Sequence, residues 1–241
     1  MKSSIDSIET FSTVDGPGIR TVVFFNECKL RCIYCHNPEM WCKRELNYTT
    51  DELVEKILKN KEYFGESGGV TFSGGEPLLQ NEFLISVCKK LKKENIHIAL
   101  DTSGVGIGNY EEILKYIDLL IFDIKHTTKD GFKEVTRIDT NEYENFLQIA
   151  NKLNKKFWIR QVIVPGIMDN DEYLESLNNY IKNNFKIDNI EKIEFLPYHK
   201  LGREKYIKLN IPYPSENISE MNKQDCEILY NKFMKIYKNI E

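Results

Sequence analysis

The sequence predicts an α/β protein whose parallel strands form an open, incomplete (β/α)6 barrel. Two observations support this prediction. Short apolar segments rich in β-branched and aromatic residues alternate along the chain with amphipathic segments of helical period. The apolar segments also have few polar interruptions, which is typical of strands buried on both faces in a parallel sheet. Six strand–helix units are fewer than a closed eight-fold barrel needs, and a doubly wound sheet is the alternative.

Each predicted strand is a short run of Val, Ile, Leu, Phe or Trp that ends near polar residues or a turn signal. In chain order, the predicted strands are residues 21–28, 69–77, 97–104, 119–125, 156–166 and 190–199. The fourth strand, LLIFDIK, has no polar residue before Asp123, and the fifth, KFWIRQVIVPG, contains Arg160. A charged side chain within an apolar strand needs a buried partner, so Arg160 is a candidate site residue.

The predicted helices lie between these strands and after the last one. They are residues 49–64, 81–94, 109–117, 141–153, 171–185 and 219–238. The first helix begins with capping-box spacing between Thr49 and Glu52. Residues 126–140 are predicted to form a loop before the fourth helix. The segment LNIPYPSEN (209–217) is predicted to be irregular.

The composition indicates one globular domain over residues 1–241, with 41% hydrophobic and 29% charged residues. The net charge is −4 and no basic block stands out, which argues against nucleic acid as a partner. The start of the chain has no apolar core of signal-peptide length, and no stretch approaches the ~18 uncharged apolar residues of a membrane span. We therefore expect a cytoplasmic protein without membrane contact, whose six cysteines are reduced.

Polar residues are concentrated at the ends of the predicted strands. They are Cys28, the turn Gly74-Gly75-Glu76-Pro77, the segment Asp101-Thr102-Ser103-Gly104, the pair Asp123 and Lys125, and His199. In parallel β/α folds, the loops after the C-terminal strand ends build the active site. The sequence therefore predicts that five strand ends contribute polar groups to one mouth of the barrel.

Three cysteines, Cys28, Cys32 and Cys35, lie in one loop with a gap of three residues and then of two. Three thiolates can hold three corners of a cubane iron–sulfur cluster and leave the fourth iron open to a substrate. The alternative is a zinc knuckle that also uses His36. Structural zinc sites normally recruit two separated ligand pairs, and adjacent Cys35 and His36 would have difficulty closing one tetrahedron.

The C-x3-C-x2-C motif with Tyr34 before its third cysteine resembles that of the radical S-adenosylmethionine superfamily. The longer segment CKLRCIYCHNP is similar to the glycyl-radical-enzyme activating enzymes. The resemblance continues through DGPGIR (15–20), GGVTFSGGEPLLQ (68–80), DTSG (101–104), FDIK (122–125), WIRQVIVPG (158–166) and LPYHKLG (196–202). It implies the incomplete barrel of the radical S-adenosylmethionine type.

The resemblance also implies a reaction. Cys28, Cys32 and Cys35 would hold a [4Fe–4S] cluster, and S-adenosylmethionine would bind its open iron through amino and carboxylate groups. Flavodoxin or ferredoxin would supply an electron that cleaves S-adenosylmethionine, and the resulting 5′-deoxyadenosyl radical would take a hydrogen atom from a backbone glycine of a partner enzyme. Motif order and spacing are similar to those of activases whose partner is pyruvate formate-lyase.

The resemblance assigns ligand positions residue by residue. Gly74, Gly75 and Glu76 would bind the methionine amino group, where a carboxylate suits an ammonium. Tyr34 and His36 would hold the adenine, and Lys125, Arg160 and His199 would contact the ligand carboxylate or nucleoside. The full set of expected cofactor-binding residues is Tyr34, Cys35, His36, Asn37, Gly74, Gly75, Glu76, Asp123, Ile124, Lys125, Arg160 and His199.

Asp101 and Asp123 form a further candidate site. Each could simply cap a helix or a turn, but two carboxylates at neighbouring strand ends suggest a shared cation. The resemblance implies a monovalent cation, Na⁺ or K⁺, held also by the backbone of Thr102 and Ile121. It further implies that Asp15, in DGPGIR, contacts the substrate loop.

The short stretch after Cys35 bears on the choice of partner. Several activases of other glycyl radical enzymes carry an inserted ferredoxin-like segment with extra cysteines. Here only Cys42 follows before the helix predicted from residue 49. This favours pyruvate formate-lyase over a dehydratase as partner. Anaerobic ribonucleotide reductase is a less favoured partner because its activators are typically shorter than this chain. A non-catalytic iron–sulfur carrier and a zinc-stabilised binding protein are the alternatives from other functional classes.

Overall fold

The computed structural model describes residues 1–42 and 44–239. The strands are β1 Lys2–Ser3, β2 Ile5–Ser12, β3 Arg20–Phe25, β4 Tyr48–Thr49, β5 Gly69–Gly74, β6 His97–Thr102, β7 Leu119–Asp123, β8 Lys156–Ile163 and β9 Ile190–Pro197. The helices are α1 Thr50–Leu58, α2 Asn81–Lys93, α3 Tyr110–Leu114, α4 Lys129–Thr136, α5 Asn141–Lys152, α6 Asp171–Asn184, α7 Arg203–Lys208 and α8 Lys223–Lys238. All six predicted strands and six predicted helices are present, although the first helix ends at Leu58.

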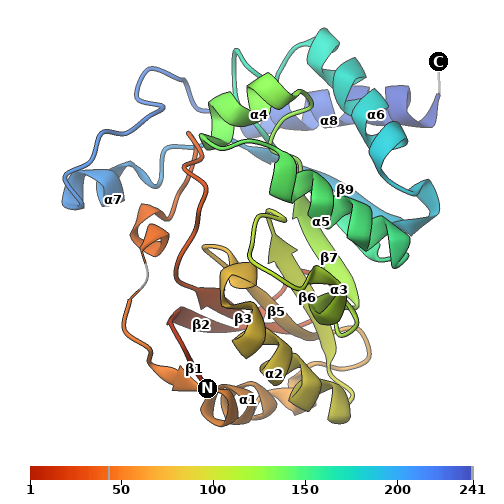
Figure 1. The fold of residues 1–241 in the computed structure, drawn as a ribbon. Helices are drawn as coiled ribbons and strands as arrows, with labels where there is room; N and C mark the ends of the chain where they lie inside the picture. Colours follow the sequence, from red (N-terminus) through yellow and green to blue (C-terminus); the bar gives the residue numbers. More distant parts are fainter. Residues whose placement is uncertain (43, 240–241) are drawn as a thin grey trace.

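The centre of the molecule is a seven-stranded sheet with the order β2-β3-β5-β6-β7-β8-β9 (Figure 1). Strands β3 to β9 of this sheet pair in parallel, and β2 is antiparallel to β3 at one edge. The order follows the chain without reversing, whereas a doubly wound sheet reverses at its switch point. Because the edge strands β2 and β9 do not pair within the part of the chain that the structure describes, the barrel is open as predicted.

The inner face of the barrel changes from apolar to polar along the strands. Ala99, Leu119, Ile121 and Trp158 pack together inside the barrel, separate from the large core under the helices. Successive side chains alternate between the faces of a strand. The inward positions two residues later along β6, β7 and β8 are Asp101, Asp123 and Arg160. The strand pattern therefore places three charged side chains above an apolar floor.

Helix α4 lies in the segment that was predicted to be a loop. Gly131 and the β-branched residues of KDGFKEVT lower its helix propensity, which explains the wrong prediction. Thr128 caps the helix by accepting a hydrogen bond from the amide of Gly131. A Cβ on Gly131 would meet His126 Nδ1 at 2.0 Å, so glycine allows the close packing that buries Phe132. Tertiary packing therefore overrides local propensity here.

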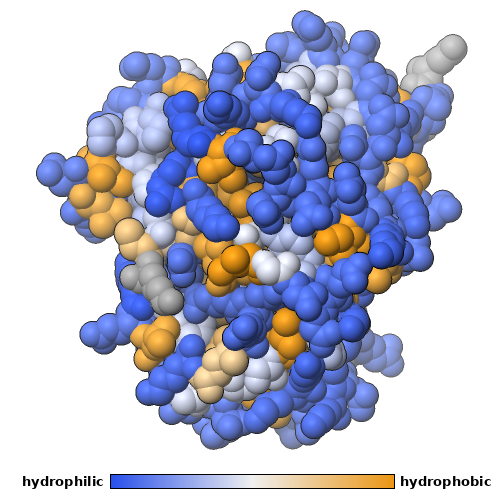
Figure 2. Space-filling model, viewed as in Figure 1, coloured by the Kyte–Doolittle hydropathy of each residue, from blue (hydrophilic) through white to orange (hydrophobic). Residues whose placement is uncertain are grey.

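The edge strand β2 and the short helix α7 were also not predicted. In β2, the register with β3 shifts twice, and its residues are mostly half-buried or exposed, so its hydrophobic pattern is weak. Helix α7 stands apart from the barrel in Figure 1. Figure 2 shows an apolar patch beside hydrophilic residues at the place of this helix. Leu201 is 77% exposed and Ile207 is 61% exposed. Neither β2 nor α7 has the regular apolar pattern from which the other strands and helices were predicted.

Candidate functional site

The cysteine-bearing loop follows β3 and is held by two other parts of the chain. The amide of Arg31 donates to the carbonyl of Thr136, and the amide of Ile33 donates to Val135, so the loop lies against the end of α4. From the C-terminal segment, Ser215 Oγ donates to the carbonyl of Ile33 at 2.6 Å. All three hydrogen bonds are made to the backbone of the cysteine loop, so they fix the loop without using the thiols.

One cavity of about 520 Å³ collects most of the predicted site residues. Its lining includes Asp15, Cys28, Cys32, Tyr34, Cys35, His36, Asn37, Gly74, Gly75, Asp101, Thr102, Asp123, Lys125, Arg160 and His199. Three predicted residues, Glu76, Ile121 and Ile124, are not part of the lining. The prediction that separate strand ends meet at one mouth is therefore confirmed.

The three thiols have the chemistry of a buried metal-binding set. Burial raises the pKa of Cys28 to about 12 and that of Cys32 to about 12, and it also raises the pKa of Cys35. The Glu76 carboxylate and the other two thiols add to this effect at Cys28. Thiols in such a site ionise when a metal supplies positive charge. Three soft ligands from one loop, facing one cavity, fit a cubane iron–sulfur cluster with one iron open to the rest of the cavity.

The glycine turn brings bare backbone to the cavity beside the cysteine loop. Gly74 has φ +110°, and a Cβ there would meet the Phe25 amide nitrogen at 2.3 Å. A Cβ on Gly75 would meet the carbonyl oxygen of Glu27 at 2.4 Å. The amide of Gly75 donates to the Phe25 carbonyl at 2.7 Å. Glycine is therefore required at both positions because β5 continues directly into this close backbone contact.

Glu76 is fully buried, and its carboxylate points into the protein. Its two oxygens accept hydrogen bonds from Thr102 Oγ1 at 2.6 Å, Ser103 Oγ at 2.6 Å, the Ser103 amide at 2.9 Å and the Leu78 amide at 3.1 Å. Burial raises the pKa of Glu76, and these hydrogen bonds oppose the shift. In this structure the carboxylate fixes the loop that follows β6 and does not line the cavity, which favours an indirect role over the predicted contact with a ligand ammonium.

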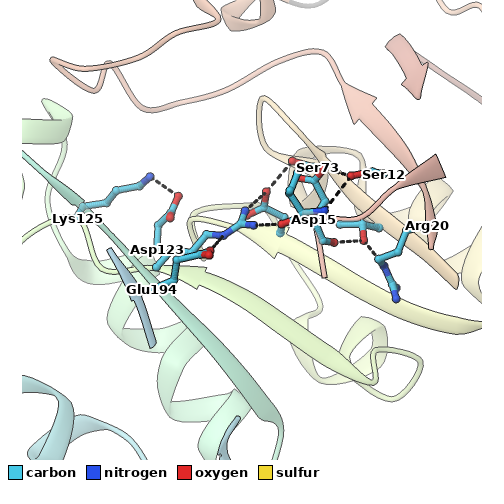
Figure 3. Close-up of polar contacts among 11 residues, drawn as sticks. Ser12, Asp15, Arg20, Ser73, Asp123, Lys125 and Glu194 are labelled. Atoms are coloured by element: carbon cyan, nitrogen blue, oxygen red, sulfur yellow. Dashed lines mark hydrogen bonds and ion pairs between the residues drawn. The ribbon is translucent and has the colours of Figure 1, made fainter. Parts of the chain in front are cut away.

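Acidic and basic side chains alternate across the cavity (Figure 3). Lys125 Nζ lies 2.7 Å from Asp123 Oδ2. Burial alone would lower the pKa of Lys125, but Asp123 holds it well above its usual value. Arg160 Nη1 lies 3.6 Å from Asp101 Oδ2. Both bases therefore stay charged, and each has an acidic neighbour, as predicted for Arg160.

Asp101 is affected by both kinds of charge. Burial raises its pKa to about 6, Arg160 opposes this shift and Asp123 adds to it. Ser73 Oγ donates to Asp101 Oδ2 at 2.8 Å, a contact that the sequence pattern did not indicate. The side chain of Ile121 is buried in the apolar floor. In residues 1–42 and 44–239, no three His, Cys, Asp or Glu side chains are arranged to share a single metal ion. The three cysteines would instead each bind a different iron of a cluster.

The aromatic side of the cavity is formed by Tyr34, His36 and His199. The two imidazole rings stack with centroids 3.9 Å apart. Burial, followed by the charge of His199, lowers the pKa of His36 to about 4, so its ring is neutral near pH 7. Tyr34 is buried, and Lys125 Nζ lies over its ring, 5.8 Å from the ring centroid. Asn37 Oδ1 accepts a hydrogen bond from Lys205 Nζ at 2.6 Å.

Trp41 and Glu194 are among the residues at the site that sequence reasoning missed. Trp41 lines the cavity beside the cysteine loop. Glu194 of β9 accepts a hydrogen bond from Arg160 Nε at 3.1 Å, and Figure 3 shows its carboxylate against this polar network. The signal available for Glu194 was its position opposite Arg160 in the next strand. Using it required the register of β8 and β9, which the sequence alone does not provide.

Comparison with known proteins agrees with this geometry. The family described as the Radical SAM superfamily matches residues 22–181. The chain is 51% identical over 235 residues to a pyruvate formate-lyase-activating enzyme of Clostridium pasteurianum, covering 96% of each chain. It is 42% identical over 228 residues to one of Staphylococcus epidermidis, covering 90% of each.

Solved structures support the fold. A domain of a pyruvate-formate lyase-activating enzyme from Bacteroides vulgatus matches with a TM-score of 0.55 at 21% identity, covering 71% of this chain and 94% of that one. SuiB of Streptococcus suis, bound to its precursor peptide SuiA, matches with a TM-score of 0.69 at 13% identity, covering 90% of this chain and 46% of that one. Across the described residues, no helix has the length and apolar character to cross a membrane. The chain belongs to the Radical SAM superfamily and, within it, to the family of pyruvate formate-lyase-activating enzymes.

Proposed function

We propose that this enzyme activates pyruvate formate-lyase by generating a radical on a backbone glycine of that partner. One observation carries the proposal: three cysteines, a bare glycine turn and paired acidic and basic side chains line the same cavity, with Asp15 also in its lining. The relatives named above carry this activity in their names. Within the described residues β2 and β9 do not pair, and an open barrel is compatible with a protein loop as substrate.

Cys28, Cys32 and Cys35 would hold the [4Fe–4S] cluster. When bound, the cluster supplies the electron that splits S-adenosylmethionine into methionine and a 5′-deoxyadenosyl group, which takes the hydrogen atom from glycine. The protein binds, orients and shields these groups, while the cofactors carry the difficult chemistry. The raised thiol pKa values mean that cluster binding must displace protons from the cysteines.

The remaining lining residues would position S-adenosylmethionine. The backbone at Gly74 and Gly75 would meet its amino group, and the charged Lys125, Arg160 and nearby His199 would meet its carboxylate or ribose. Tyr34, His36 and Asn37 would hold the adenine. Glu76 would act indirectly, by fixing Thr102 and Ser103 beneath the ligand. Ile124 would contribute only through its backbone, because its side chain is fully buried.

We further propose a monovalent cation, Na⁺ or K⁺, between Asp101 and Asp123. Carboxylate and backbone oxygens suit such hard cations. Asp123 contributes to raising the pKa of Asp101, and a cation between them would relieve this repulsion. The backbone carbonyls of Thr102 and Ile121 would complete the site.

The electron donor would be flavodoxin or ferredoxin, and the reaction would take place in the cytoplasm. All six cysteines are free, and Cys88 and Cys226 are buried within α2 and α8. Cys42 is exposed and has no assigned role.

Anaerobic reconstitution tests the proposal. We expect about four irons and four sulfides per chain and broad absorption near 400 nm that bleaches on reduction. The reduced protein should convert S-adenosylmethionine to 5′-deoxyadenosine. Cys32→Ala should not, whereas Cys88→Ala, which removes a buried thiol outside the cavity, should behave as the parent. Bound zinc without a chromophore, or equal cleavage by Cys32→Ala, would contradict the proposal.

A further inference from the structure

Glu194 is placed to control the direction of the Arg160 side chain. The two residues face each other in the register of β8 and β9. Glu194 Oε2 accepts a hydrogen bond from Arg160 Nε at 3.1 Å, and Glu194 Oε1 accepts one from Lys192 Nζ at 2.8 Å. Arg160 lines the cavity, whereas Glu194 does not. Since both carboxylate oxygens are engaged, Glu194 holds Arg160 from outside the ligand site.

The guanidinium of Arg160 also reaches the opposite edge of the open sheet. Its Nη2 donates to the carbonyl oxygen of Val14 at 2.6 Å. Val14 belongs to residues 13–19, the segment that joins the edge strand β2 to β3. Glu194 lies on β9, the other edge strand. One arginine therefore connects the edge strand β9 with the segment that follows the other edge strand, β2.

The same segment is anchored at its next residue from inside the barrel. The carbonyl of Asp15 accepts a hydrogen bond from Thr71 Oγ1 at 2.6 Å, and Thr71 Oγ1 accepts one from the buried Arg20 at 2.7 Å. The Asp15 carboxylate accepts one from Ser12 Oγ at 2.6 Å. Val14 is 68% exposed, so its side chain packs little against the protein. The hydrogen bond from Arg160 to its carbonyl oxygen is therefore what holds this residue. The segment thus presents Asp15 to the cavity and Val14 to solvent.

We propose that Glu194 is a positioning residue that fixes Arg160 on the Val14 carbonyl and so holds residues 13–19 ready for the glycine-bearing loop of the protein substrate. The part concerning the substrate rests on the function proposed above. Without Glu194, the nearest carboxylate to Arg160 is that of Asp101, inside the cavity and 3.6 Å from Nη1. The guanidinium would then turn toward Asp101, and Nη2 would leave Val14.

Hydrogen exchange measured by mass spectrometry tests the positioning role without any activity. In Glu194→Ala, the amides of residues 13–16, 18 and 19 should exchange about tenfold faster than in the parent, which corresponds to losing about 1.4 kcal/mol of local stability. Glu194→Gln keeps one acceptor oxygen for Nε and should lie between the two. Glu191→Ala removes an exposed carboxylate from the same strand and is the matched control, with parent-like exchange.

Kinetics with the reconstituted enzyme and a peptide copy of the glycine-bearing loop test the consequence. For Glu194→Ala, KM for the peptide should rise about tenfold with a smaller change in kcat, because the segment is loosened rather than the chemistry altered. Unchanged exchange of residues 13–19, or faster exchange with parent-like KM, would overturn the proposal. If the parent itself forms no glycyl radical, the proposed function fails, and the exchange experiment still decides whether Glu194 holds the segment.

Discussion

Replacing Glu76 by Gln tests whether this residue supports the site from below or binds the ligand directly. One oxygen of its carboxylate accepts hydrogen bonds from Thr102 Oγ1 and the Leu78 amide, and the other from Ser103 Oγ and the Ser103 amide. The two hydroxyls can rotate to become acceptors, but the two backbone amides cannot. Whichever oxygen the NH2 of Gln replaces, one backbone N–H then faces another donor.

The expected loss of stability follows from the number of backbone amides that are left without an acceptor. A buried backbone amide left without an acceptor costs about 1–3 kcal/mol, so Glu76→Gln should lower the free energy of unfolding by about 2 kcal/mol. Glu76→Ala leaves both amides without an acceptor and should cost about 4 kcal/mol. Urea denaturation of the metal-free, reduced protein measures both values, provided that the slope of the transition is unchanged.

Binding of S-adenosylmethionine to the reconstituted protein distinguishes the two roles of Glu76. If the carboxylate supports the loop, Glu76→Gln should be less stable and its Kd should change less than about tenfold. If the carboxylate met the ligand ammonium, loss of a charged hydrogen bond would weaken binding by about 10-fold to 100-fold. Parent-like stability combined with such weakened binding would refute our reasoning.

Three further predictions follow from the structure. Gly75→Ala should cost about 2 kcal/mol or more in urea denaturation, because its Cβ would lie 2.4 Å from a carbonyl oxygen. Burial, followed by the charge of Arg20, lowers the pKa of His97 in the folded protein, so this imidazole binds a proton more readily in the unfolded chain. The free energy of unfolding should therefore fall as the pH drops below ~6.5, and it should fall less steeply in His97→Gln. Ser215→Ala leaves the Ile33 carbonyl without its side-chain donor and should cost about 1–2 kcal/mol and speed iron loss to a chelator.

Much of the fold could be predicted because its parallel strands are buried on both faces. Segments such as LLIFDIK are apolar throughout, and hydrophobic pattern alone identifies them. The edge strand β2 lacks that pattern because it is only partly buried. Helix α4 could not be predicted, since its glycine is favoured by contact with His126, which local sequence does not reveal.

The site residues also fall into those that the sequence could predict and those that it could not. Residues at strand ends, such as Asp101 and Asp123, could be predicted because the fold class brings strand ends together. The direction of the Glu76 carboxylate depends on Ser103, which is distant in sequence, so a motif could name the residue without fixing its orientation. Glu194 was missed because a carboxylate on an edge strand is normally solvated. Its role emerges only from its cross-strand contact with Arg160.

We infer that this chain uses S-adenosylmethionine to place a radical on a glycine of pyruvate formate-lyase. The most direct test incubates the reduced, reconstituted enzyme with S-adenosylmethionine and pyruvate formate-lyase, and reads the partner by electron paramagnetic resonance while quantifying 5′-deoxyadenosine. We predict a glycyl radical on the partner, formed with 5′-deoxyadenosine and absent with Cys32→Ala. Formation of 5′-deoxyadenosine without a radical on the partner, or no cleavage at all by a protein that holds its full cluster, would contradict the claim.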